Sequence, residues 1–382
     1  MKGLPIDLLL TELVGSRPLD DERWRDLLAT DWEALDRLAD DHRCRPALHR
    51  LRGGEQIIPQ SIRAGWVESF RASTLAALAK RAELVRIARD LAEARIPMAA
   101  LKGAWLAWEV YPEPGLRPLR DLDILVPPDR ALEARTRLLD LGYKQCEETA
   151  LPLEEWAARY KHLPAVISPE GHVVEIHTRL WDDDGRMPPQ PIGLLERRIE
   201  SAAMPGLFVL SPIDNVMHLA VHAAFHRFDG GPLMLLDFAM LAEKANALDL
   251  PALWDRAARE GWDRHAALCV HAADRWTQSG TAEALACPVT VPEEMLSDVP
   301  TLIGKPLDAR ESDIAAAKLT RRDIGVGKKL RRVLARRERY DSLSEYGRWV
   351  GGEVRNTFAK RATPGDRMRH DAIARLDDWL RA

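Results

Sequence analysis

Two carboxylates stand one residue apart at the start of an apolar segment. Asp121 and Asp123 open the run Asp-Leu-Asp-Ile-Leu-Val, a pattern typical of a short buried strand. Successive side chains on a strand point to opposite faces, so both carboxylates are expected on one face. Acidic groups this close repel one another unless a cation lies between them, and oxygen-rich sites suit Mg²⁺ or Mn²⁺. The spacing therefore predicts a divalent-metal site, although isolated pairs of this type are more often simply solvated.

A third acidic side chain is expected on a later strand. The Pro and Gly of Ser168 to Gly171 suit a type I turn, and the apolar segments on either side predict a hairpin. In its second strand, from Val173 to Thr178, Glu175 and His177 share a face. Glu175 alone would be interpreted as solvent-facing, but phosphoryl chemistry at two divalent ions needs a further carboxylate. His177 is a second-rank candidate, which could orient an acceptor or be a satisfied edge histidine.

The segment before the acidic pair has features that bind phosphate. An apolar run ends in Lys102-Gly103, and a helix-like segment follows from Ala104 to Val110. A Pro/Gly loop then carries Arg117 and Arg120. A helix start and basic loop residues facing a metal site suit a triphosphate.

These motifs resemble those of the nucleotidyltransferases of the DNA polymerase beta type. More narrowly, the block from Leu-Lys-Gly to Arg-Asp-Leu-Asp-Ile-Leu-Val and the later Val-Val-Glu-Ile-His resemble a bacterial branch labelled uncharacterised nucleotidyltransferase. The resemblance covers roughly the middle third of the chain and, more weakly, the helical segment after it. The positions that match the family's turn, acidic pair and third carboxylate are Gly103, Asp121, Asp123 and Glu175. Lys102-Gly103 replaces the usual Gly-Ser, and the gap to the acidic pair is longer than usual.

The resemblance implies transfer of a nucleoside monophosphate from an NTP, with ATP the expected donor, to an acceptor, with pyrophosphate leaving. Asp121 and Asp123 would hold both Mg²⁺ or Mn²⁺ ions, and Glu175 would share the ion that activates the acceptor hydroxyl. The leaving phosphates would be bound by Lys102, the Gly103 amide and one of Arg117 or Arg120. A small molecule or peptide is favoured as the acceptor over RNA, and no DNA or membrane partner is expected.

A later helical segment carries three histidines at four-residue spacing. His218, His222 and His226 would line one side of this helix. Such spacing can bind a metal, but a polar helix edge facing a cleft is the more ordinary interpretation. In the resembling family a helical region after the catalytic strands helps to close the cleft, which makes His222 and Asp237 second-rank candidates.

Two other function classes stay open. One is a metal-dependent phosphohydrolase built on the histidine helix and Asp237, although its usual His-Asp dipeptide occurs only at His370-Asp371. The other is a non-catalytic module that binds a nucleotide or a partner on the same fold. The altered Lys102-Gly103 turn favours this module, whereas three carboxylates favour an enzyme.

Length and composition set the wider expectations. The 382 residues allow more than one core. We expect an α+β fold: an N-terminal helical region (1–95), a nucleotidyltransferase-type mixed sheet (96–210) and a C-terminal helical region (211–382). The net charge of −4 argues against a uniformly basic protein that coats nucleic acid. Scattered cysteines indicate reduced thiols, and the lack of a long apolar run indicates no membrane span, so a cytoplasmic location is expected.

Local signals also predict individual elements. The Ala/Leu/Arg/Glu composition between Pro59 and Pro97 predicts a long helix. A second helix is expected from Pro128 to Leu141, with Gly142 just after its end. The Pro-rich stretch from about Gly280 to Ser312 indicates a linker or an irregular excursion. The basic segment that follows is expected to bind RNA weakly and in a salt-sensitive way at most.

Overall fold

The computed structural model describes residues 6–15, 17–20, 22–146, 151–182, 187–228, 230–303 and 364–381. The chain divides into two compact units, residues 1–304 and 305–382. The first unit contains the whole described sheet, and the described helix of the second is α18 (Pro364–Arg381). The division at residues 95 and 210 stays a prediction. The basic segment after residue 318 lies outside the described residues.

The centre of the first unit is a mixed sheet of seven strands in the order β3-β4-β5-β2-β1-β7-β6. The strands are β1 (Ala99–Ala100), β2 (Leu122–Leu125), β3 (Lys144–Gln145), β4 (Val166–Ile167), β5 (Val173–His177), β6 (Ile199–Glu200) and β7 (Phe208–Val209). β2 is parallel to β5 and β1 is parallel to β7, whereas the other neighbours are antiparallel. With helices before, between and after these strands, the expected α+β fold is confirmed.

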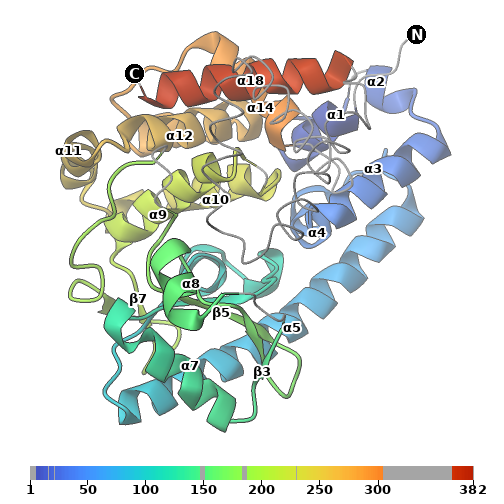
Figure 1. Ribbon diagram of the computed structural model, residues 1–382. Coiled ribbons are helices and arrows are strands. Elements are labelled where there is room, and N and C mark those ends of the chain that lie inside the picture. The colour runs from blue at the N-terminus through green and yellow to red at the C-terminus, as the bar shows by residue number, and fades with distance from the viewer. Residues whose placement is uncertain are drawn as a thin grey trace, which may run out of the picture. The chain divides into compact units, whose positions relative to one another are not determined.

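Helices cover both sides of this sheet. In the view of Figure 1, α9 and α10 lie above the strands, and α5 and α7 lie below them. All four residues of β2 are buried. A strand covered on both faces needs apolar side chains in succession, which explains the Leu-x-Ile-Leu-Val run and makes the acidic Asp123 within it the exception.

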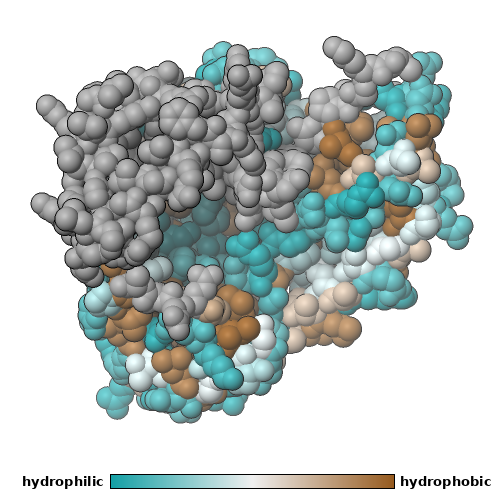
Figure 2. Space-filling view, turned by 45° about the vertical axis from the view of Figure 1, so that its right-hand side comes forward, coloured by the Kyte–Doolittle hydropathy of each residue, from teal (hydrophilic) through white to brown (hydrophobic). Residues whose placement is uncertain are grey.

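The N-terminal region is helical, as expected. Its helices are α1 (Ile6–Val14), α2 (Glu22–Arg25), α3 (Ala29–Asp41), α4 (Arg45–Arg52) and α5 (Gln60–Glu93). The predicted long helix is α5, which runs unbroken for 34 residues. On the face shown in Figure 2, hydrophilic and hydrophobic residues are interspersed over the described surface.

The segment between β1 and β2 rests on α5. It forms α6 (Gly103–Trp105), a π-helical turn η1 (Leu106–Val110) and a 3₁₀ turn η2 (Pro114–Leu116). A Cβ on Gly115 would lie 2.0 Å from Thr74 Oγ1 of α5, so only glycine permits this approach. Lys80 Nζ of α5 also donates to the carbonyl oxygen of Leu119 at 2.7 Å. The long helix therefore fixes the loop that leads into β2.

The expected elements after β2 are present. A 3₁₀ turn, η3 (Pro128–Arg130), leads into α7 (Ala131–Asp140), and Gly142 follows with a left-handed φ of 92°. β4 and β5 form the predicted hairpin, in which the Gly171 amide donates to the Ser168 carbonyl oxygen at 2.9 Å. The structure adds a short helix before this hairpin, α8 (Leu153–Arg159).

The residues after β7 form a helical layer. Its elements are α9 (Pro212–Phe225), α10 (Leu233–Glu243), η4 (Ala245–Ala247), α11 (Leu250–Glu260), α12 (Asp263–Thr277), α13 (Thr281–Ala284) and α14 (Glu293–Ile303). The linker prediction is wrong over its described part, because α14 buries Met295, Val299 and Leu302 and contacts α1. In the part of the chain that the structure describes, no helix is long and apolar enough to cross a membrane.

Candidate functional site

Two parallel strands bring the acidic residues together. Asp123 of β2 is in register with Glu175 of β5, and Leu125 is in register with His177. Neighbouring strands lie about 4.8 Å apart, so side chains at one register position on one face are adjacent. One donor atom from each of Asp123, Glu175 and His177 lies within 4.8 Å of the other two. We call these three residues the acid centre.

His177 joins the two carboxylates. Its Nε2 lies 2.8 Å from Asp123 Oδ1 and 3.3 Å from Glu175 Oε2, and its side chain is fully buried. Its Nδ1 lies 3.3 Å from the Arg179 carbonyl oxygen. Both ring nitrogens therefore face oxygen acceptors, which fixes the orientation of the imidazole.

Lys102 approaches the same carboxylate from the turn after β1. Its Nζ lies 2.9 Å from Asp123 Oδ1, and the preceding Leu101 amide donates to the Asp123 carbonyl oxygen at 3.0 Å. Lys102 has a φ of 47°, a left-handed conformation that costs a non-glycine residue about 1–3 kcal/mol. Such strain is found where a side chain must point in one direction, and here that direction is toward Asp123.

The surrounding charges keep the acid centre ionised. Burial alone would raise the pKa of Asp123, but the Lys102 ammonium and the His177 ring hold it well below its ordinary value. Burial also acts to raise the pKa of Glu175, and so does the charge of Asp123, but the hydrogen bond from His177 together with the positive charges of His162 and His177 lowers that pKa overall. Two carboxylates that remain charged in a buried position are suited to a cation.

Asp121 lies beside the acid centre without belonging to it. The strand begins at Leu122, and Asp121 is part of the bend before it. Its Oδ2 accepts a hydrogen bond from Arg120 Nε at 3.2 Å, and the Arg120 side chain is largely exposed. The structure therefore brings Lys102, Asp123, Glu175 and His177 together. Arg120 and Asp121 lie in the bend just before the strand that carries Asp123.

Arg117 and Asp237, two separate candidates in the sequence, form one buried ion pair. Arg117 Nε and Nη2 donate to the two carboxylate oxygens of Asp237 at 2.7 and 3.0 Å, and the Tyr111 hydroxyl donates to Asp237 Oδ1 at 2.8 Å. Burial would lower the pKa of Arg117, yet the charge of Asp237 raises it. This pair fastens both ends of the loop around η2 to α10.

His222 lies in the middle of the predicted histidine row. The ring centroids of His218 and His222 are 5.8 Å apart, and those of His222 and His226 are 4.4 Å apart. The row therefore occupies one side of α9, as the four-residue spacing predicts.

Sequence reasoning missed two residues beside this site, Lys161 and His162. His162 Nε2 lies 3.7 Å from Glu175 Oε2, and its backbone pairs with that of His177. Lys161 Nζ lies 3.4 Å from His226 Nε2. Both precede the hairpin in an irregular segment, where no periodic pattern marks them, so only the fold shows their position.

The acid centre has donors that fit a divalent metal. Carboxylate oxygens suit Mg²⁺ and Mn²⁺, and an imidazole nitrogen is accepted more readily by Mn²⁺ and later transition metals than by Mg²⁺. The contact of His177 Nδ1 with a carbonyl oxygen is the outer contact that commonly orients a metal-binding histidine. Asp123, Glu175 and His177 could therefore supply two oxygens and one nitrogen to one ion.

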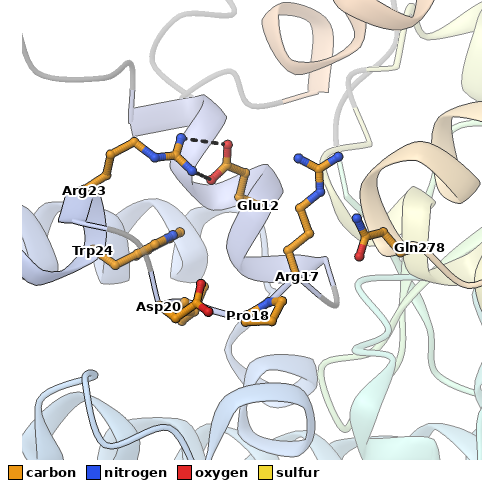
Figure 3. Close-up of a pocket in the computed structure, with 8 residues that line it drawn as sticks. Glu12, Arg17, Pro18, Asp20, Arg23, Trp24 and Gln278 are labelled. Carbon is orange, nitrogen blue, oxygen red and sulfur yellow. Dashed lines mark hydrogen bonds and ion pairs between the residues drawn. The ribbon is translucent and has the colours of Figure 1, made fainter.

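A separate cavity of about 350 Å³ lies among the N-terminal helices. Figure 3 shows Arg23 paired with Glu12 on one side of it, with Arg17 and Gln278 nearby. None of its lining residues is a site candidate. The chemistry that the sequence predicts is therefore located at the sheet and not at this cavity.

A family model described as an uncharacterised nucleotidyltransferase matches residues 29–278. This range contains every described strand and the helices from α3 to α12. It also contains all the candidate residues discussed above. No curated protein and no solved structure shows a significant match to the chain.

Proposed function

The chain belongs to the uncharacterised nucleotidyltransferase family, and on that premise we propose that it transfers a nucleoside monophosphate from an NTP to an acceptor and releases pyrophosphate. One observation carries the proposal: Asp123 and Glu175 face each other on parallel strands, with Lys102 beside them at the turn after β1. The proposal includes kinship with the DNA polymerase beta type of enzyme, a bacterial source and a cytoplasmic location.

The proposed cofactor is Mg²⁺ or Mn²⁺, with ATP as the NTP. Asp123, Glu175 and His177 would hold the metal. Asp121, in the bend before β2, is proposed as a further oxygen ligand. When bound, a divalent ion neutralises phosphate charge and lowers the pKa of an acceptor hydroxyl. The inclusion of His177 in the donor set favours Mn²⁺ more than an all-oxygen site would.

The basic groups are proposed to bind the phosphates that leave. Lys102 is held against Asp123 without the nucleotide, and its flexible stem lets the ammonium move to a phosphate oxygen. The Gly103 amide, at the start of α6, lies next to it in the chain. Arg120 is the better arginine for this role, because its side chain is largely exposed. The Arg117 guanidinium is already bound to Asp237 through Nε and Nη2.

Glu175 is proposed to accept the proton of the acceptor hydroxyl. Its pKa is lowered, so the carboxylate is ionised near neutral pH and can accept a proton. His177, whose side chain is fully buried, holds this carboxylate in place. A small molecule or a peptide is the proposed acceptor, ahead of RNA.

The geometry supports a phosphohydrolase less well than it supports a nucleotidyltransferase. Asp237 is committed to Arg117 and Tyr111, and the histidines of α9 form no three-donor metal group with it among the described residues. A non-catalytic module would bind the nucleotide without turnover. A nucleotidyltransferase releases pyrophosphate, a phosphohydrolase releases inorganic phosphate and a non-catalytic module releases neither, so the products distinguish the three classes.

The test incubates the purified protein with labelled NTPs, Mg²⁺ or Mn²⁺ and fractionated small molecules and peptides as acceptors. We expect pyrophosphate release and a labelled acceptor. Asp123→Asn and Glu175→Gln should each reduce the rate on the order of 10²- to 10³-fold, as loss of a group that stabilises transition-state charge does. Asp129→Asn, at an exposed acid of the same region, is the control and should match wild type. Release of inorganic phosphate, or wild-type turnover by Asp123→Asn, would refute the proposal.

A further inference from the structure

The histidine row of α9 leads from the surface toward the interior. His226 is exposed, His222 is half-buried and His218 is buried. Successive ring centroids are 4.4 and 5.8 Å apart, so the three imidazoles form a continuous strip. The buried member of this strip, His218, needs hydrogen-bond partners for its ring nitrogens.

A buried ammonium group lies beside the outer end of the strip. Lys161 is only 7% exposed, and its Nζ lies 3.4 Å from His226 Nε2. Its backbone is fixed, because its amide donates to Asp182 Oδ1 at 2.6 Å and its carbonyl oxygen accepts from the Thr178 amide at 2.9 Å. No acidic side chain of the described residues forms a salt bridge with Lys161 Nζ, so its charge lies against imidazole and the Phe225 ring.

The inner end of the strip, His218, is the most deeply buried of the three histidines. His218 is 1% exposed, and neither of its ring nitrogens has a hydrogen-bond partner within the described residues. Burial lowers the pKa of His218, and the positive charges of Lys102 and His177 lower it further.

This arrangement is costly without a ligand. A buried donor left without an acceptor costs about 1–3 kcal/mol, and a buried ammonium that has carboxylates near it but none in direct contact keeps part of its desolvation cost. A metal is a poor solution, because the histidines of α9 do not form a group of three close donors in the described part of the chain. An anion with several acceptor oxygens would satisfy both the imidazole N–H groups and the ammonium.

We propose that Lys161, His226, His222 and His218 form the binding surface for the polyphosphate of the nucleotide. Lys161 joins the strip to the strand of the acid centre, because its carbonyl oxygen accepts from the amide of Thr178, the residue after His177. The phosphates would therefore lie along α9 beside this strand. This inference rests on the proposed function and specifies where the nucleotide's phosphates lie.

The test is a calorimetric titration of inorganic pyrophosphate into the full-length protein, with EDTA present and at fixed ionic strength. Lys161→Met should weaken binding about tenfold, the size expected for one charge-assisted hydrogen bond. His222→Gln and His226→Gln should weaken it less, since each removes a neutral donor. Lys144→Met on β3 and His271→Gln on α12 are the matched controls and should leave the affinity unchanged. Melting curves confirm that each variant is folded.

Asp123→Asn separates this inference from the proposed function. It should stop nucleotidyl transfer while keeping or raising the affinity for pyrophosphate, because a nearby negative charge is removed. If no NTP and acceptor pair gives turnover but Lys161→Met still loses affinity, the proposed function fails and the phosphate surface stands. Unchanged affinity in Lys161→Met and His222→Gln, no pyrophosphate binding by wild type, or Zn²⁺ binding that depends on the histidines in place of pyrophosphate binding would overturn the inference.

Discussion

Two buried carboxylates, Asp123 and Asp237, each meet a basic side chain, and they do so in different ways. Asp237 uses both oxygens for the two nitrogens of Arg117 and adds the Tyr111 hydroxyl. Asp123 receives the ammonium of Lys102 at 2.9 Å on one oxygen, and that same oxygen also meets His177. A two-pronged guanidinium pair is rigid, whereas a lysine is a point charge on a flexible stem.

We propose that this difference separates a structural pair, Arg117 with Asp237, from a functional pair, Lys102 with Asp123. Arg117 and Asp237 connect the loop around η2 with α10, across 120 positions of the chain. The pair of Lys102 with Asp123 involves one member of the acid centre, and we propose that it opens when a cation or a phosphate competes for either partner. An acidic residue's role thus follows from the geometry of its partner as much as from its own chemistry.

The largest expected effect comes from breaking the structural pair. Asp237→Ala leaves the Arg117 guanidinium buried without a counter-charge, which should lower the free energy of unfolding by about 3–5 kcal/mol. Urea denaturation measures this loss. Asp123→Asn should lower the free energy of unfolding by less, because asparagine gives His177 and Lys102 a polar partner of nearly the same volume. If Asp123→Asn lowered the free energy of unfolding more than Asp237→Ala, the Asp237 pair would not be the structural one.

Removing the lysine of the Lys102–Asp123 pair should raise the affinity for a metal ion and lower the affinity for a nucleotide. Lys102→Met removes an ammonium that competes with a metal for Asp123, so the affinity for Mn²⁺ alone should rise about tenfold. The affinity for a non-hydrolysable ATP analogue should fall, because the proposed phosphate contact is lost. Electron paramagnetic resonance of Mn²⁺ and calorimetry of the analogue measure the two. If both affinities remain at the wild-type values, Lys102 has no part in the site.

The smallest effect is on the pH dependence of stability without metal. The folded-state pKa of Asp123 lies below the ordinary value of about 3.9, so its ionised form stabilises the fold. This contribution is complete above about pH 4 and is lost as the pH falls through the folded-state pKa. Over that interval wild type should lose up to about 1.4 kcal/mol per pH unit more than Asp123→Asn. Urea titrations at pH 4.5 and pH 3 test this, and parallel losses in both proteins would contradict it.

Local patterns in the sequence were enough for much of the fold. Composition predicts α5, helical periodicity predicts α7, and the Pro and Gly of the turn predict the hairpin of β4 and β5. All three depend on residues that are neighbours in the chain. The prediction for α14 fails because prolines suggest irregular structure, whereas its apolar residues find a partner in α1, far away in the sequence.

The candidate site was less accessible to sequence reasoning. The alternation rule places Asp121 and Asp123 on one face only if both belong to the strand, and the strand begins between them at Leu122. The ion pair of Arg117 with Asp237 and the approach of Lys161 to His226 depend on long-range packing. No spacing in the sequence encodes such contacts.

The short strand β1 also sets an order of events during synthesis. β1 pairs with β2, made soon after it, and with β7, where Ala100 meets Val209 much later in the chain. At about 5–20 residues per second, a ribosome delivers β7 several seconds after β2. Since β5 also precedes β7 and α9, the acid centre can assemble while one edge of β1 is still uncovered. Nascent chains that stall in this interval would expose a strand edge that invites aggregation, which makes prompt completion of β7 a requirement for a good yield of folded protein.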